Sequence, residues 1–220
     1  MTKFLDDLRS RTPSAEERLP PGQVLTTKWP VLHYGNVPKV DTASWTFDLT
    51  GLVDRPLALT YEELLTLPRK TVMCDMHCVT RWSRLDNAFE GVPVQLLLQR
   101  AGVKPAAQYC LVSAEHGFTT NLPLADLDRP DNLIALKWNG ESLAPEHGWP
   151  ARLLVPHLYL WKSAKWVRGF TLLDADVPGF WEQNGYHMRG DPWKEERYGG
   201  RPITQHEINR LRNLSKKGVT

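Results

Sequence analysis

The stretch Thr71-Val-Met-Cys-Asp-Met-His-Cys-Val-Thr-Arg-Trp-Ser83 combines two of the three cysteines with a histidine, an arginine and a tryptophan. Soft sulfur ligands beside cationic side chains are typical of a metal site or a reactive thiolate. Cys78 therefore has three possible uses: a metal-bound thiolate, a nucleophile, or a buried structural cysteine. The positive charges of His77 and Arg81 would favour the first two uses by lowering the pKa of the thiol.

A closed zinc site and a papain-type nucleophile both fit this stretch poorly. Cys74 and Cys78 have no second Cys or His pair at zinc-finger spacing, and no papain signature surrounds them. Cys74 and Cys110 fall in predicted strands, where a free cysteine is usually a small core residue. We therefore expect both of them in the core, and only Cys78 keeps a chemical role open.

The composition excludes several classes of protein. A formal net charge of +2 on 220 residues argues against a nucleic-acid binder that relies on bulk charge, and seventeen prolines argue against a helical bundle. No apolar run approaches the roughly 18 residues that cross a bilayer, so no integral membrane segment is expected. Residues 1–9 lack the apolar core of a secretory signal, and three cysteines suit a reducing compartment. These features predict a cytoplasmic protein.

Hydrophobic patterning predicts a chain built mostly of strands. Residues 44–51 alternate apolar and polar side chains, with Trp45, Phe47 and Leu49 inward. Asn139-Gly140 is a strong hairpin signal. Further strands are expected at 70–74, 109–114, 133–138, 153–155 and 166–173, with a polar loop at 115–121.

Helices are expected to be short and few. A capping box opens a helix at Thr60-Tyr-Glu-Glu63, and residues 91–102 carry proline near the start and glycine at the end of a second helix. A short helix is also possible at residues 3–9. Because strands and helices interleave without a βαβ rhythm, we predict an α+β fold with mixed sheets. The predicted organisation is a peripheral segment 1–22, a single domain 23–203, and a basic C-terminal helix 204–220 that begins with a second capping box.

Several basic residues and histidines fall in the second half of the chain. Any single lysine there is most simply explained by a solvated face, but Arg152 and Lys165 adjoin apolar strands, where a charge needs a partner. A phosphate or pyrophosphate is one such partner. Together with histidines in glycine-containing loops, these residues predict a loop-built pocket for a polar, anionic ligand. The residues considered are Arg152, Lys162, Lys165, Arg168, His33, His116 and His147.

Over roughly residues 20–200 the chain resembles the molybdopterin-binding domain of the sulfite oxidase family, particularly its small, haem-free prokaryotic members. The resemblance depends on an ordered set of segments, of which no single one is decisive. They are Pro20-Pro-Gly-Gln23, Trp29-Pro-Val-Leu-His-Tyr-Gly35, His77-Cys-Val-Thr-Arg-Trp-Ser83, Gly91-Val-Pro93, His116-Gly-Phe-Thr-Thr-Asn-Leu-Pro-Leu124, Gly148-Trp-Pro-Ala-Arg-Leu-Leu-Val-Pro156, Lys162-Ser-Ala-Lys165 and Gly190-Asp-Pro-Trp193.

The resemblance implies a molybdenum–molybdopterin cofactor. In that family one cysteine thiolate binds molybdenum and the pterin dithiolene supplies two more sulfurs, so the resemblance implies Cys78 as the metal ligand. Arg152 suits the cofactor phosphate through bidentate hydrogen bonds. The complete set of cofactor-binding residues that the resemblance implies is His33, Tyr34, Cys78, His147, Arg152, Ser163, Ala164 and Lys165.

The resemblance also implies an oxidoreductase that transfers an oxygen atom to or from a small sulfur or nitrogen oxide, such as sulfite or a sulfoxide. His77, Arg81 and His116 are the expected anion-binding rim and, with Cys78, the expected catalytic residues. A separate electron-transfer protein is expected because the chain has no Cys-x-x-Cys-His haem motif, no iron–sulfur cysteine set and no flavin fingerprint.

Two positions beside Cys78 depart from the family pattern. Thr80 stands where methionine-sulfoxide-reducing relatives carry a carboxylate, and Trp82 follows Arg81 where vertebrate-type members place sulfite-binding arginines. These departures leave the substrate open. They also support an alternative hypothesis, a non-catalytic molybdopterin-binding or interaction module that keeps the fold without redox turnover.

Overall fold

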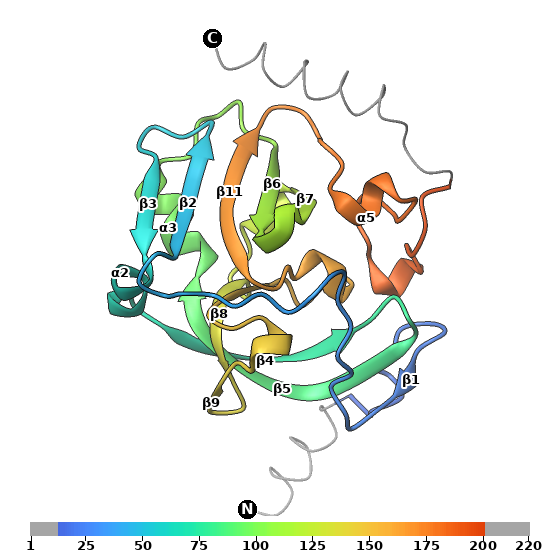
Figure 1. The fold of residues 1–220 in the computed structure, drawn as a ribbon. Coiled ribbons are helices and arrows are strands. Elements are labelled where there is room, and N and C mark those ends of the chain that lie inside the picture. The colour runs from blue at the N-terminus through green and yellow to red at the C-terminus, as the bar shows by residue number, and fades with distance from the viewer. Residues whose placement is uncertain (1–12, 201–220) are drawn as a thin grey trace, which may run out of the picture.

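The computed structural model describes residues 13–200, which form two mixed β-sheets joined by short helices (Figure 1). The expected α+β class is confirmed. The first sheet contains β1 (Val24–Leu25), β4 (Lys70–His77), β5 (Trp82–Pro93), β8 (Leu133–Trp138), β9 (Glu141–Ser142) and β10 (Arg152–Leu154). The second has the order β3 (Leu57–Thr60), β2 (Thr46–Gly51), β11 (Val167–Leu173), β6 (Tyr109–Ala114) and β7 (Thr119–Pro123).

The helical segments are all short. No helix within residues 13–200 combines the length and apolar character needed to cross a membrane. The helices expected at residues 3–9 and from 204 onward lie outside the described residues. The helical segments are α2 (Tyr61–Thr66), α3 (Val94–Ala101), α4 (Leu124–Leu127) and α5 (Phe180–Gln183), with single turns η1 (Glu115–Gly117), η2 (Pro145–His147), η3 (Leu160–Lys162) and η4 (Pro192–Lys194).

The structure confirms three predictions from local sequence: a helix start, a helix end and a hairpin turn. At the start of α2 the Glu63 amide donates to Thr60 Oγ1 at 3.2 Å, and the Glu63 carboxylate accepts from the Thr60 amide at 2.9 Å. Gly102 ends α3 in the left-handed conformation that glycine adopts without strain. Asn139 and Gly140 both have positive φ in the turn between β8 and β9, as a tight hairpin requires.

Strand β5 is the longest of the strands that the sequence analysis missed, which also include β1, β3 and β7. It pairs with β1, β4 and β8, so it is the centre of the first sheet. Its last residues, Gly91–Pro93, were expected to begin a helix, but the structure places them in the strand and starts α3 at Val94. The reason is a close approach of two strands: a Cβ on Gly91 would lie 2.2 Å from the Ile134 carbonyl oxygen. The prediction of a polar loop over residues 115–121 is also wrong for its second half, because β7 begins at Thr119.

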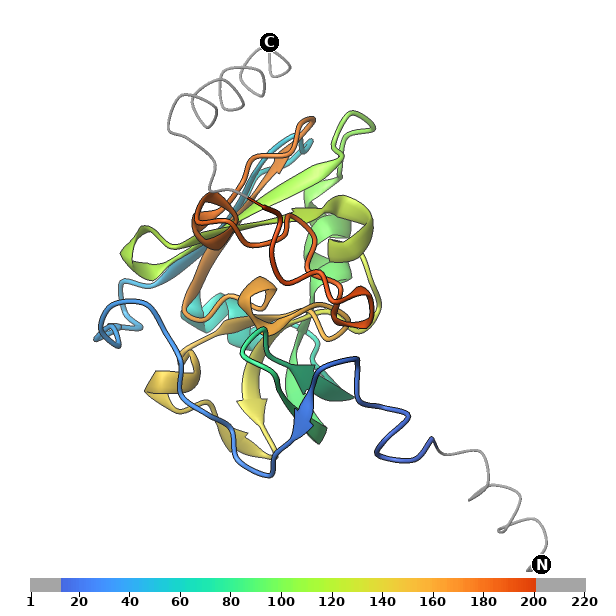
Figure 2. The same ribbon diagram turned by 90° about the vertical axis from the view of Figure 1, so that its right-hand side faces the viewer.

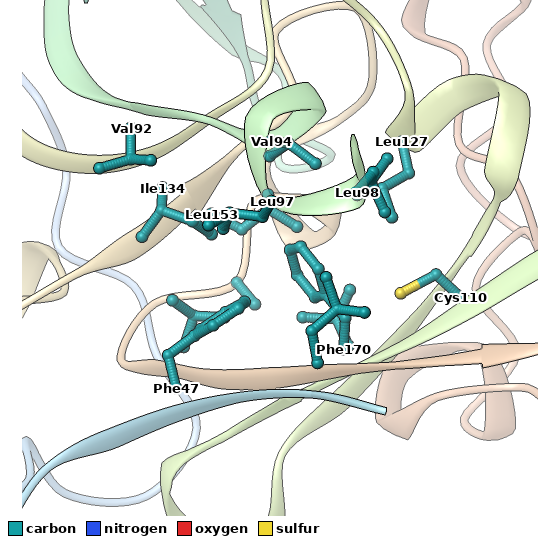
Figure 3. Close-up of a cluster of buried hydrophobic side chains, with 14 of the residues drawn as sticks. Phe47, Val92, Val94, Leu97, Leu98, Cys110, Leu127, Ile134, Leu153 and Phe170 are labelled. Carbon is teal, nitrogen blue, oxygen red and sulfur yellow. The ribbon is translucent and has the colours of Figure 1, made fainter. Parts of the chain in front are cut away.

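The main core lies between the two sheets and includes one face of α3 (Figure 3). Trp45, Phe47 and Leu49 are buried as predicted, and Phe47 meets Phe170 of β11 edge-on at 5.0 Å. Each such side chain contributes about 1.5–3 kcal/mol on burial. Cys110 is in this core as expected, whereas Cys74 is only partly buried at the edge of a second cluster. The other side chains labelled in Figure 3 are Val92, Val94, Leu97, Leu98, Leu127, Ile134 and Leu153.

Residues 26–45 run without regular structure from β1 across the molecule to β2 (Figures 1 and 2). Trp29 anchors this connecting segment by stacking on His147 at 4.0 Å. Upstream of β1, Arg18 Nε donates to Asp75 Oδ2 at 2.9 Å, so the end of the predicted peripheral segment contacts the first sheet. The domain bounds of 23 and 203 stay a prediction.

Candidate functional site

A cavity of about 360 Å³ lies where the β4–β5 turn, the connecting segment, the loops after β6 and β10, and α5 meet. Its volume falls in the range of ligand pockets. The lining is made of Trp29, Pro30, Leu32, His33, Tyr34, Cys78, Val79, Thr80, Trp82, Glu115, His116, Phe118, Arg152, Leu160, Trp161, Ser163, Ala164, Lys165, Trp166, Phe180, Trp181 and Tyr186.

Cys78 sits in the turn that joins β4 to β5 and lines this cavity. Two backbone bonds fix the turn: the Cys78 amide donates to the Trp82 carbonyl at 2.9 Å, and the Arg81 amide donates to the Cys78 carbonyl at 3.0 Å. The Cys78 Sγ atom lies 3.1 Å from Thr80 Oγ1. The thiol is therefore held at a fixed place with a polar neighbour.

The electrostatics of Cys78 differ from expectation. Burial raises the pKa of the Cys78 thiol; the hydrogen bond to Thr80 and the charges of Arg197 and Lys165 oppose that rise. The expected neighbours His77 and Arg81 are not among the cations that lower this pKa. The cations that do so, Arg197 and Lys165, are distant from Cys78 in the sequence. Arg197 is 5 % exposed and donates to the Val79 carbonyl at 2.8 Å.

His77, Arg81 and His116 do not form one anion-binding rim. His77 is buried beside the turn, its Nδ1 2.8 Å from Ser83 Oγ, and burial lowers its pKa to about 4. Arg81 is exposed, and neither residue lines the cavity. His116 does line it, from the exposed rim and with a left-handed φ of 57°. A catalytic role for these three residues stays a prediction, and only His116 has a position that supports direct contact.

One side of the cavity, here called the basic wall, consists of Arg152, Ser163, Ala164 and Lys165. Arg152 is 2 % exposed, and its two terminal nitrogens donate to the carbonyls of His147 at 2.9 Å and Ser163 at 2.8 Å. Its Nε has no partner, and burial lowers the pKa of Arg152 to about 10. Among the described residues no carboxylate pairs with this guanidinium.

Lys165 repeats the pattern. Its Nζ donates only to carbonyls, those of Leu32 at 2.8 Å and Glu146 at 2.6 Å. Burial and the charge of Arg152 lower the pKa of Lys165 to about 7. Within residues 13–200 it too lacks a carboxylate partner. A buried and a partly buried cation without carboxylates are costly unless an anion joins them.

The loop before β10 holds Arg152 in place. A Cβ on Gly148 would lie 3.0 Å from the Cβ of Arg152, so this position needs glycine. His147 stacks on Trp29 and supports Arg152 through its carbonyl, but it does not line the cavity. The prediction that His147 touches the cofactor thus has no geometric support. The other predicted cofactor-binding residues, His33, Tyr34, Cys78, Arg152, Ser163, Ala164 and Lys165, all line the cavity.

Lys162 was expected on a solvated face and is instead fully buried. Its Nζ lies 2.6 Å from Glu182 Oε1 and donates to Asn121 and the Met188 carbonyl. Glu182 also accepts from the indole nitrogen of Trp161, which lines the cavity, at 2.8 Å. The sequence could not reveal this pair, because Lys162 and Glu182 belong to separate helical segments, η3 and α5.

A second group of lining residues, here called the aromatic wall, consists of Tyr34, Phe118, Phe180, Trp181 and Tyr186. Trp181 stacks on Tyr186 at 4.9 Å, and Phe180 lies 5.0 Å from Trp181 and 4.6 Å from Tyr34. Apart from Tyr34, the sequence analysis assigned none of these residues to the site. Their segments have no periodicity, and only the density of aromatic residues could have indicated them.

The residues present fit a sulfur-ligated, anionic cofactor. Within residues 13–200 no group of three or more His, Cys, Asp or Glu side chains could hold a metal ion by itself. A metal at Cys78 would therefore take its other ligands from elsewhere, as a pterin dithiolene supplies them. The uncompensated positive charge of Arg152 and Lys165 matches the phosphate of such a group.

Comparisons with known proteins agree with this reading. The family described as oxidoreductase molybdopterin binding domain matches residues 34–181. The uncharacterized oxidoreductase YuiH of Bacillus subtilis is 49 % identical over 191 residues, which cover 86 % of this chain and 96 % of YuiH. The catalytic subunit of the protein-methionine-sulfoxide reductase MsrP of Gluconobacter oxydans is 30 % identical over 199 residues, which cover 74 % of this chain and 64 % of that protein.

A solved structure is similar as well. The sulfane dehydrogenase SoxCD from Paracoccus pantotrophus superposes with a TM-score of 0.61 and 28 % sequence identity, over 66 % of this chain and 42 % of that chain. The chain thus spans nearly all of YuiH but under half of the matched SoxCD chain.

Proposed function

Since the chain belongs to the molybdopterin-dependent oxidoreductases of the sulfite oxidase family, we propose that it transfers an oxygen atom to or from a small sulfur or nitrogen oxide. In the reductive direction a sulfoxide, two electrons and two protons give a sulfide and water. One observation carries the proposal: the Cys78 thiol shares a cavity with a buried arginine, Arg152, and a partly buried lysine, Lys165, that have no carboxylate partner among the described residues.

The cofactor is molybdenum–molybdopterin, and the chain's own residues have distinct roles toward it. Cys78 would bind the metal, and Thr80 would hydrogen-bond the sulfur. Arg152 and Lys165 would hold the anionic end of the pterin. When bound, the cofactor supplies two-electron oxygen-atom transfer, while the protein orients it and excludes water.

The names of relatives support both directions of transfer. MsrP is named as a reductase and SoxCD as a dehydrogenase. The proposal therefore covers reduction of an oxide and oxidation of a reduced sulfur compound. A separate electron-transfer protein, expected from the sequence, remains part of the proposal, and so does a cytoplasmic location, which cell fractionation would test.

Metal loading and a cysteine pair test the proposal. Protein expressed with molybdate should contain molybdenum and pterin, and should turn over sulfoxides or N-oxides with reduced viologen, or sulfite with ferricyanide. Cys78→Ser should abolish turnover and lower molybdenum content without changing the circular dichroism spectrum. Cys74→Ser is the matched control, because Cys74 does not line the cavity.

Two results would contradict the proposal: folded protein that never contains molybdenum and pterin, or a Cys78→Ser variant that keeps full turnover. The non-catalytic alternative predicts bound pterin without turnover of any of these substrates. The thiol and both cations line the cavity, which supports turnover over that alternative.

A further inference from the structure

Arg197 is a buried arginine beside the Cys78 turn that has no role in the cavity. Only 5 % of the residue is exposed, and it is not among the lining residues. Within residues 13–200 its carboxylate contact is a long one, 3.9 Å to Glu195 Oε1, and the Glu195 side chain is 50 % exposed. A buried guanidinium that is paired so weakly is costly, which points to a benefit elsewhere in the molecule.

The guanidinium holds the Cys78 turn by its backbone. Arg197 Nη1 donates to the Val79 carbonyl at 2.8 Å, and Nη2 donates to the Pro21 carbonyl at 3.2 Å. Gln23 Nε2 adds a third bond, which it donates to the Cys78 carbonyl at 3.1 Å. The segments before β1 and after η4 therefore meet at the backbone of Cys78 and Val79, although Arg197 is 118 residues away from Val79 in the chain.

Packing also fixes the position of this guanidinium. It lies 5.0 Å from the ring of Tyr159, which is fully buried and belongs to the same cluster as Cys78. Gly22 approaches it as well: a Cβ there would lie 3.4 Å from Arg197 Nη2 and 2.9 Å from Arg81 Nη1. The guanidinium is thus held in contact with the turn, an aromatic ring and a glycine.

A fixed positive charge at this place acts on the sulfur of Cys78. Burial raises the pKa of the thiol, and after the hydrogen bond to Thr80 the charges of Arg197 and Lys165 oppose that rise. Lys165 lines the cavity, where a bound cofactor anion would offset its charge, whereas Arg197 lies outside the lining. Positive charge beside a metal–thiolate centre favours its more negative, reduced form and so raises the reduction potential.

We propose that Arg197 is a positioning residue for Cys78: it anchors the backbone of the ligand turn and supplies a positive charge that raises the reduction potential of the metal bound there. The inference rests on the proposed function and deepens it, because it assigns a residue outside the cavity to the metal-binding thiol. Loss of Arg197 should therefore change both the mobility of the turn and the potential of the metal.

Redox potentiometry of the molybdenum-loaded protein tests the charge. At the potential where half of the molybdenum in the wild-type protein is reduced, the ratio of reduced to oxidised metal in Arg197→Gln should be about tenfold lower, which is about 59 mV for a one-electron step. Arg197→Lys keeps the charge and should stay close to the wild-type potential. Lys194→Gln removes an exposed cation of the same segment that does not line the cavity, and it is the matched control.

Amide hydrogen exchange of the cofactor-free protein tests the anchoring. The amides of Cys78 and Arg81 close the turn through hydrogen bonds to the Trp82 and Cys78 carbonyls. In Arg197→Gln these two amides should exchange about tenfold faster, because the turn loses a charged hydrogen-bond donor. Amides of the core strand β2 should exchange as in the wild-type protein, which separates local loosening of the turn from a loss of global stability.

Three results would overturn the inference: a wild-type potential in Arg197→Gln, a shift in Arg197→Lys as large as that in Arg197→Gln, or turn amides that are accelerated no more than those of β2. The exchange measurement needs no metal, so it judges the anchoring whatever the protein binds. Protein that never contains molybdenum would overturn the proposed function and the charge role with it, whereas a wild-type potential in loaded Arg197→Gln would overturn the charge role alone.

Discussion

Lys162 and Lys165 lie three residues apart, yet the fold treats their charges in opposite ways. Lys162 is fully buried, and the chain itself supplies Glu182 and three oxygen acceptors around its ammonium group. Lys165 and the neighbouring Arg152 face the cavity and receive only carbonyl oxygens from the described residues. The charge of Lys162 is thus balanced by the chain itself, whereas the charges of Arg152 and Lys165 would be balanced only by a bound anion.

This difference separates a cation that stabilises the fold from cations that bind a ligand. Removing one member of a buried ion pair destabilises the fold, because the other member is left in the interior as an unpaired charge. A buried charge without an internal partner lowers the stability of the cofactor-free protein, and its benefit is the binding of an anionic ligand. The predictions below test whether the two regions really divide in this way.

The largest effect is expected from Lys162→Met. Removing the ammonium strands the Glu182 carboxylate in the interior, so the free energy of unfolding should fall by about 3–5 kcal/mol. Urea denaturation of the cofactor-free protein would measure this. The double variant Lys162→Met with Glu182→Gln should be less destabilised than the sum of the single variants, because it leaves no buried charge. Additive effects would show that the pair is not coupled.

A smaller stability effect but a larger ligand effect is expected from Arg152→Gln. The carbonyls of His147 and Ser163 would lose donors, which costs about 1–3 kcal/mol. The molybdenum and pterin content of the purified protein should fall at least about tenfold, since a bidentate charged contact is lost. Arg152→Lys keeps the charge without the planar fork and should lie between. Unchanged cofactor content in Arg152→Gln would contradict the assignment of this region to the anion.

The pKa of His147 should report the uncompensated charge. Burial, followed by the charges of Lys165 and Arg152, lowers this pKa to about 4 from an ordinary 6.5. A bound anionic cofactor would offset those two charges and raise the pKa, and Lys165→Met should raise it in the cofactor-free protein. NMR titration of the imidazole would measure both shifts; no change on loading would argue against an anion beside this loop.

The same shift gives a pH dependence with a defined sign. Between about pH 4 and 6.5 the folded protein keeps His147 neutral, whereas the unfolded chain binds the proton. The unfolded state then holds more protons, so the contribution of His147 to the stability of the cofactor-free protein should fall as pH drops through this window and be constant above it. The buried His77 contributes in the same window.

The smallest effect is expected from Arg168→Gln. Arg168 pairs with Glu115 at 3.1 Å, but both side chains are about a quarter to a third exposed, 31 % and 26 %. Pairs of this kind contribute about 0.2–1 kcal/mol. Thermal unfolding should change little, and cofactor content should not change. If Arg168→Gln lowered the free energy of unfolding as much as Lys162→Met, solvent exposure would not explain the difference between the Arg168–Glu115 and Lys162–Glu182 pairs.

The sequence by itself determined the features that depend on a few neighbouring residues. The capping box at Thr60, the hairpin at Asn139-Gly140 and the inward alternation of Phe47 and Leu49 act through hydrogen bonds and sterics within one element. The ordered motifs around Cys78 also identified the family and its cofactor, because ligand chemistry depends on residue type.

Only the tertiary structure decided which of these residues share a cavity. It buried His77 beside the turn, gave Lys162 its carboxylate from α5, twenty residues away in the chain, and left Arg152 and Lys165 without one among the described residues. It also assembled the aromatic wall from three separate segments and made β5 the centre of a sheet. Burial and charge compensation depend on contacts between distant segments, and no local pattern of residues encodes them.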